Sequence, residues 1–143
     1  MARQLFVNLP VKDLDRSVEF FTKLGYTFNP QFTDENATCM IIGENNYAML
    51  LVEDYFRTFT DKEIIDAHKG IEVTIAVALD SREEVDEHVR LAREAGARVP
   101  REPQDYGFMY QHAFQDLDGH LWEVFYMDPS AIPDQAAEAA KAG

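Results

Sequence analysis

The carboxylate of Glu123 is the strongest candidate for chemistry in this sequence. It lies in the run LWEVF, residues 121–125, whose apolar character predicts a strand. Burying a carboxylate there is costly unless it has a partner. Glu123 is therefore a candidate catalytic residue, and the alternative is a structural ion pair or hydrogen bond, for example to Arg3, His112 or Tyr110.

Five further residues are candidates for binding a ligand. Asn8 and His112 stand on predicted strands, where each is either a ligand contact or a hydrogen-bonded structural residue. Tyr106, Phe108 and Tyr110 lie in a segment that mixes Pro, Gly, charge and aromatic rings. That segment predicts the rim of an apolar pocket. The alternative is an irregular edge strand that Pro and charge protect from aggregation.

Composition excludes several classes of protein. The 13 Lys and Arg against 26 Asp and Glu give a net charge of −13, which repels nucleic acid and anionic membrane surfaces. We expect neither partner and a cytoplasmic location, because no apolar stretch is long enough for a signal peptide or a membrane span. There is no phosphate-binding glycine loop, zinc-type cysteine pair or Gly-x-Ser-x-Gly elbow. The lone Cys39 is expected to be a buried apolar residue.

The first half of the chain predicts the order strand, helix and three strands. An alternating strand at 5–11 precedes a helix that Asp13 would cap and Gly25 would end. Two turn-rich links separate the β-like runs that follow. These runs are residues 26–32, 37–42 and 47–52.

The second half repeats this order. A strand at 72–79 leads to a helix opened by Asp80 and Ser81, and Asp13 and Asp80 are 67 positions apart (80 − 13). Such a period indicates a duplicated unit. The fold class expected is α+β, with two βαβββ modules, each a curved mixed four-stranded sheet with an outer helix, forming a cleft. The remaining strands are expected at 97–99, 109–115 and 120–127.

One domain is expected over residues 1–133. It comprises a first module at 4–53, a connector at 54–70 with a helical-looking run at 62–68, and a second module at 71–129. The tail, 134–143, has helix propensity but little to pack against, so we expect it to fray.

Several motifs resemble those of a known superfamily. The runs VKDLDRS at 11–17 and FFTKLGY at 20–26, with DLDGHLWEV at 116–124, resemble the glyoxalase I, bleomycin resistance and extradiol dioxygenase group, the vicinal oxygen chelate superfamily. Leu117 stands where that closing motif has Pro. The runs at 6–14 and 100–110 are similar to a bacterial branch labelled as predicted lactoylglutathione lyases.

The resemblance implies a divalent ion held by about four side chains on the first and last strands of each module, acting as a Lewis acid. Here three of those positions fall on residues that cannot serve well, namely Phe6, Thr74 and either Leu50 or Leu51. Glu123 alone keeps the family ligand. We therefore expect no cofactor; the alternative is one divalent metal ion.

Three functions remain open. The first is a metal-free protein that handles a small organic ligand in the cleft between modules, as bleomycin resistance proteins do; an acidic, aromatic-lined cleft would suit a cation. The second is a metal-dependent lyase or dioxygenase of the glyoxalase I type. The third is a structural or regulatory dimer with a vestigial pocket. A homodimer is expected in each case, because two short modules expose sheet edges.

Overall fold

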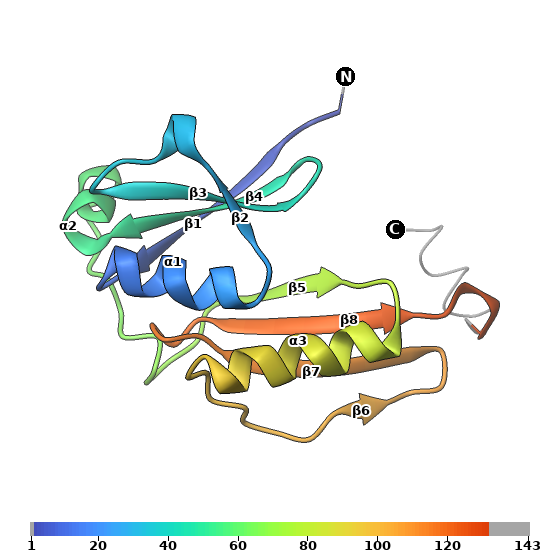
Figure 1. The fold of residues 1–143 in the computed structure, drawn as a ribbon. Coiled ribbons are helices and arrows are strands. Elements are labelled where there is room, and N and C mark those ends of the chain that lie inside the picture. The colour runs from blue at the N-terminus through green and yellow to red at the C-terminus, as the bar shows by residue number, and fades with distance from the viewer. Residues whose placement is uncertain (1, 132–143) are drawn as a thin grey trace. The chain divides into compact units, whose positions relative to one another are not determined.

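Two four-stranded sheets form the framework of this computed structural model, which describes residues 2–131 (Figure 1). The chain divides into two units, Met1–Gly70 with Leu117–Gly119, and Ile71–Asp116 with His120–Gly143. The tail predicted to fray, 134–143, lies outside the described residues. The fold class expected from the sequence, two mixed sheets with helices, is confirmed.

The first sheet has the strand order β1-β4-β3-β2. Strand β1 runs parallel to β4, and the other neighbours are antiparallel. This mixed pattern arises because the helix α1 carries the chain from β1 back to the same end of the sheet. The strands are β1 (Leu5–Val11), β2 (Thr27–Asn29), β3 (Ala37–Gly43) and β4 (Asn46–Val52).

Helix α1 (Leu14–Lys23) begins and ends where the sequence predicts. The Asp13 side chain accepts a hydrogen bond from the backbone N–H of Arg16, and Gly25 has a φ of 101°, which a glycine adopts without strain. The side chains of Phe20 and Phe21 are buried at the helix face. Cys39 is also buried, as expected.

Strand β2 is shorter than the run 26–32 that the sequence predicts. It ends at Asn29, and a 3-10 turn, η1 (Pro30–Phe32), follows. Pro30 has no N–H for the ladder, and the Asn29 side chain accepts a hydrogen bond from Gln31 N–H instead. Local capping therefore overrides β propensity here.

The second sheet repeats the arrangement with the order β5-β8-β7-β6. Strand β5 is parallel to β8, so the strands predicted around 72–79 and 120–127 do share a sheet. Helix α3 (Arg82–Glu94) packs on β7 and β8 and buries Trp122 and Phe114 between them. The strands are β5 (Thr74–Ala78), β6 (Gln104–Asp105), β7 (Met109–Gln115) and β8 (Leu121–Met127).

The internal repeat has a period one residue longer than the 67 positions predicted. The cap of α3 is Ser81, whose hydroxyl accepts a hydrogen bond from Glu84 N–H, and Asp80 stands before the cap. The two capping residues, Asp13 and Ser81, are 68 positions apart (81 − 13).

Two other predicted elements are wrong. Residues 97–99 form no strand, only an isolated bridge from Arg98 to Gln115, and β6 supplies the fourth strand instead. The run 62–68 is not helical. The connector instead contains α2 (Glu53–Phe56) and the 3-10 turn η2 (Arg57–Phe59), where Asp54 pairs with Arg57. A third 3-10 turn is η3 (Pro129–Ala131). Among residues 2–131, no helix is long and apolar enough to cross a membrane.

The turn Leu117–Gly119 belongs with the first unit. The Asp118 carboxylate accepts hydrogen bonds from Lys12 N–H, at 2.9 Å, and from the Ser17 hydroxyl, at 3.2 Å. Arg16 lies 3.8 Å from the same carboxylate. Asp118 thus satisfies polar groups at the start of α1, next to the cap itself.

Candidate functional site

Strand register divides the second sheet into a helix-covered face and an open face. Ala76, Ala113 and Glu123 occupy registered positions on adjacent strands, so their side chains share a face. Trp122 and Val124 point the other way, towards α3, and are fully buried. Glu123 therefore lies on the face of this sheet that α3 does not cover.

The Glu123 carboxylate lies between two alanines. Ala76 flanks it on β5 and Ala113 flanks it on β7, and Ala76 is exposed. Along its own strand, the neighbours on the same face are Leu121 and Phe125, both half-buried. The carboxylate side chain keeps 24% of its accessible surface. A charged group on this strand is thus partly open to solvent.

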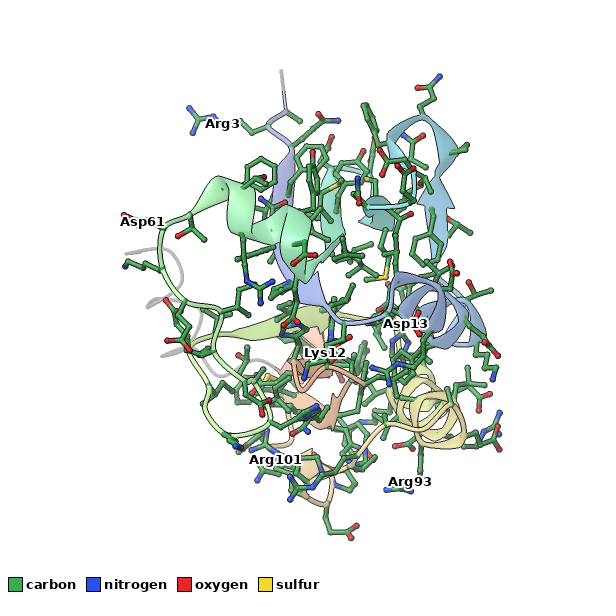
Figure 2. The ribbon with its side chains drawn as sticks, turned by 90° about the vertical axis from the view of Figure 1, so that its left-hand side faces the viewer. Arg3, Lys12, Asp13, Asp61, Arg93 and Arg101 are labelled. Atoms are coloured by element: carbon green, nitrogen blue, oxygen red, sulfur yellow. The ribbon has the colours of Figure 1, made fainter. Side chains whose placement is uncertain are left out.

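Arg101 is the charged partner of Glu123. A guanidinium nitrogen, Nη2, lies 3.8 Å from Glu123 Oε1, a separation at which charges attract without a hydrogen bond. The sequence predicted an ion pair as one alternative, but it proposed Arg3, His112 or Tyr110 as the partner. In Figure 2, Arg101 lies away from α3, whose position Arg93 marks.

His112 lies on the opposite face of the sheet from Glu123. It is registered with Val124, so it points to the side that α3 covers, and it is 7% exposed. Its Nε2 is 3.0 Å from the carbonyl oxygen of Arg101. Because a carbonyl oxygen only accepts, Nε2 carries the proton in this bond. His112 therefore fixes the main chain of Arg101.

Tyr110 also points to the helix-covered side. Its hydroxyl donates to Asp86 at 2.6 Å, and the Arg82 guanidinium lies over its ring at 5.2 Å from the centroid. The hydrogen bond to Asp86 raises the pKa of Tyr110 to about 12, with burial adding to the effect. Arg82 also pairs with Asp105 at 2.9 Å.

The other two aromatic candidates lie at the turn between β6 and β7. Tyr106 is 52% exposed, and its hydroxyl donates to the side chain of Gln104. Phe108 is half-buried, and its carbonyl oxygen accepts a hydrogen bond from Asp128 N–H at 2.8 Å. These residues form the end of the hairpin between β6 and β7.

The open face of the first sheet is neutral. Asn8 is exposed there, and Phe6 stacks on Tyr47 with ring centroids 4.8 Å apart. A shift of 68 positions relates Asn8 to Ala76; Asn8 pairs with Met49 as Ala76 pairs with Glu123. Met49 is therefore the counterpart of Glu123. The sequence placed that position at Leu50 or Leu51, and the register corrects it by at least one residue.

The donor set does not fit a resident metal ion. Phe6, Met49 and Thr74 stand at the positions related to the family ligands, and only a hydroxyl and a thioether are available among them. Within residues 2–131, no three His, Cys, Asp or Glu side chains come together in a group that could hold a metal ion. A divalent ion needs several charged or imidazole donors, so Glu123 alone would hold one weakly.

Sequence reasoning found Glu123 and missed Arg101. Arg101 lies in an irregular segment, and no periodicity shows which strand its side chain would reach. The signal that could have found it is the need of Glu123 for a cation. From the sequence, His112 is either a ligand contact or a hydrogen-bonded structural residue, and in the structure it is hydrogen-bonded to the main chain of Arg101.

Comparisons with known proteins agree with this architecture. The model of a family described as bleomycin resistance protein-like N-terminal matches residues 3–43. A hypothetical protein from S. aureus is 30% identical, with a TM-score of 0.75 over 88% of this chain and 95% of that chain.

Two further solved structures share the fold. A glyoxalase/bleomycin resistance protein/dioxygenase from Nocardioides is 27% identical, with a TM-score of 0.66 over 94% of this chain and 91% of that chain. A fosfomycin resistance protein from Listeria monocytogenes is 19% identical, with a TM-score of 0.63 over 92% of this chain and 98% of that chain. No curated protein sequence matches this chain.

Proposed function

We propose that this chain is a member of the glyoxalase/bleomycin resistance/dioxygenase superfamily, which it resembles in residues 3–43 and in fold. We propose further that it binds a small organic molecule on the open face of its second sheet, without a resident metal ion. The environment of Glu123 carries this proposal. The one retained family carboxylate is paired with Arg101 at 3.8 Å instead of being grouped with other metal-ligating side chains. The guanidinium of Arg101 thus balances the negative charge of Glu123, which a metal ion would balance in a metal-binding site.

The surroundings of Glu123 support binding by contact. Leu121 and Phe125 offer half-buried apolar surface on the same face, and Thr74 adds an exposed hydroxyl two positions from Ala76. Apolar surface with a few fixed polar groups is typical of small-molecule sites. The match to a bleomycin resistance protein-like family favours binding without a chemical reaction. Apolar surface and a few polar groups are sufficient for such binding.

Metal content is the first test. We expect protein purified without a metal-affinity tag to carry no stoichiometric Zn, Ni, Mn or Fe by elemental analysis. We also expect no appreciable lactoylglutathione lyase activity, although part of the sequence resembles that branch. About one metal ion per chain, lost in Glu123→Ala, would overturn the metal-free proposal and favour the alternative, a metal-dependent lyase or dioxygenase.

Ligand binding is the second test. With alanine methyl groups labelled for NMR, a small aromatic molecule that binds the open face should shift the Ala76 and Ala113 methyl signals in a saturable way. Ala48, buried on the helix-covered face of the first sheet, and Ala92, buried on α3 itself, supply internal reference signals. Equal shifts at all four methyls would indicate a nonspecific effect and contradict the assignment of this face.

We also propose a cytoplasmic homodimer. Strands β1 and β5 each end a sheet, and exposed apolar side chains precede or begin both of them, including Phe6, Ile71 and Val73. Such edges favour pairing with another chain. Light scattering at micromolar concentration should give twice the monomer mass of 16.4 kDa, and the monomer mass itself would count against the dimer.

A further inference from the structure

The guanidinium of Arg101 has unused hydrogen-bonding capacity. It carries five N–H donors, and its separation from Glu123, 3.8 Å, is too long for a hydrogen bond. In the described part of the chain, no other group pairs with this side chain, which is 41% exposed. A planar donor fork therefore faces solvent on the open face of the second sheet.

Two features hold this fork in place. The main chain of Arg101 is tied at its carbonyl oxygen by the buried His112, at 3.0 Å. The charge of Glu123 attracts the other end of the side chain across the small Ala113. Orienting a long side chain before binding reduces the entropy lost when a ligand arrives.

There is also room beside the pair. Ala76, the registered neighbour of Glu123 on β5, is exposed and carries only a methyl group. Leu121 and Phe125 lie before and after Glu123 on the same face. A ligand with an apolar body could therefore lie along β8 while its polar end meets Arg101.

We propose that Arg101 is the specificity-determining residue of this site and that it selects a small apolar molecule bearing one carboxylate. This inference rests on the proposed function and adds the chemical class of the ligand. A guanidinium binds a carboxylate through two parallel N–H···O bonds, a geometry that neutral groups cannot match. Because Glu123 remains nearby and repels negative charge, a monoanion is favoured over a dianion.

The ligand charge inferred from Arg101 is negative, whereas the composition of the chain favours a positively charged ligand. A net charge of −13 predicts attraction of a cation, but that field acts at long range and is screened by salt. On β8 at the open face itself, the acidic side chain of Glu123 already has a cationic partner. The unfilled donors belong to Arg101, so the local chemistry selects an anion.

Three probes with one common body test the sign of the charge. They are 2-naphthoate, 2-naphthamide and 2-naphthylmethylammonium, titrated into the full chain while the Ala76 methyl signal is followed by NMR. We expect naphthoate to bind about tenfold more tightly than naphthamide, the effect of one charge-assisted contact at a half-exposed site, and the ammonium to bind most weakly. Raising the salt from about 20 mM to about 500 mM should weaken naphthoate binding.

Matched variants test the residue. Arg101→Gln should lower naphthoate affinity about tenfold, to the level of naphthamide, and leave naphthamide binding unchanged. Arg101→Lys should retain part of the preference, because a lysine keeps the charge and loses the fork. Arg93→Gln, on the outer surface of α3, removes the same charge elsewhere and should change nothing. Thermal unfolding should show all three variants folded.

The outcomes separate the two proposals. If none of the three probes binds, the proposed function fails, and the inference fails with it. If naphthamide or the ammonium binds as tightly as naphthoate, or if Arg93→Gln weakens naphthoate binding as much as Arg101→Gln does, the site binds small molecules and the inference alone is wrong. Tighter naphthoate binding by Glu123→Gln, which removes the repelling charge, would support it further.

Discussion

The fourth strands of the two sheets, β4 and β8, occupy the same place in the same topology and differ in chemistry. Met49 on β4 and Glu123 on β8 face the open side of their own sheet at corresponding registers. The turns before the strands differ as well. A Cβ added at Gly43 would meet only the Asn46 side chain, whereas a Cβ added at Gly119 would meet the backbone of residues 67 and 68. A duplicated scaffold thus carries a charge on only one of its two corresponding strands.

The largest expected effect concerns these turns. Gly119 has a φ of 92°, and a Cβ there would lie 2.6 Å from the backbone nitrogen of His68. We expect Gly119→Ala to lower the free energy of unfolding by about 3 kcal/mol or more, because backbone strain and a clash with backbone atoms combine. Gly43→Ala, whose nearest contact would be 3.7 Å, should cost less than about 1 kcal/mol. Urea denaturation of both variants measures the difference, and equal losses would mean that the turns are equivalent.

A carboxylate placed on β4 should have an intermediate effect. Met49→Glu copies the residue of β8 without an arginine beside it, so we expect a loss of about 2 kcal/mol from burying part of an unpaired charge. Met49→Gln introduces a polar side chain without a charge, so its difference from Met49→Glu measures the effect of the charge alone. Met49→Leu should change the free energy of unfolding very little. Chemical denaturation at neutral pH is the measurement. Full stability of Met49→Glu would show that the open face of the first sheet tolerates charge as the second does.

The smallest effect concerns the two helices. His88 on α3 is the counterpart of Phe20 on α1, by the same shift of 68 positions, and its ring lies 5.9 Å from that of Phe114. Burial lowers the pKa of His88 below its ordinary value of 6.5, although Glu84 opposes the shift. The unfolded chain then binds the proton more readily, so this contribution is complete above pH 6.5 and is lost as the pH falls below it.

His88→Phe should remove this pH dependence. Between about pH 7.5 and about pH 5.5, the wild type should lose up to about 1 kcal/mol more stability than the variant. Thermal midpoints at the two pH values measure it, with His68→Gln, an exposed histidine, as the control. Identical slopes for all three proteins would assign the acid sensitivity to carboxylates alone.

Much of the fold follows from local sequence. The strand at Leu5–Val11 and the helix capped by Asp13 carry their own periodicity and capping signals, and both are found where predicted. Strand β6 has only two residues, Gln104 and Asp105, too few for any pattern. The predicted helix at 62–68 fails because propensity in a short segment is weak without a face to bury.

The site is harder to predict for the same reason. Glu123 stands out as a charge within an apolar strand, but which of thirteen basic residues meets it depends on register and loop path. For His112 the sequence left a ligand contact and a structural hydrogen bond open, and alternation along β7 places the side chain on the face opposite Glu123. The position on β4 that corresponds to Glu123 was predicted at Leu50 or Leu51, and the register places it at Met49. An error of one residue matters because side chains alternate between the two faces of a strand.

Asp118 has a consequence for the order in which the protein can fold during synthesis. Its carboxylate accepts a hydrogen bond from the backbone N–H of Lys12, which precedes it by 106 positions. While a ribosome is still making the chain, β1 to β4 and α1 emerge long before this carboxylate exists. The hydrogen bonds from Lys12 N–H and the Ser17 hydroxyl to Asp118 therefore cannot form until most of the second unit has been translated, and until then water solvates both donors. The first unit thus cannot complete its folding before the second unit is made. A fragment that ends near residue 70 should therefore lack the hydrogen bonds to Asp118 that stabilise the start of α1.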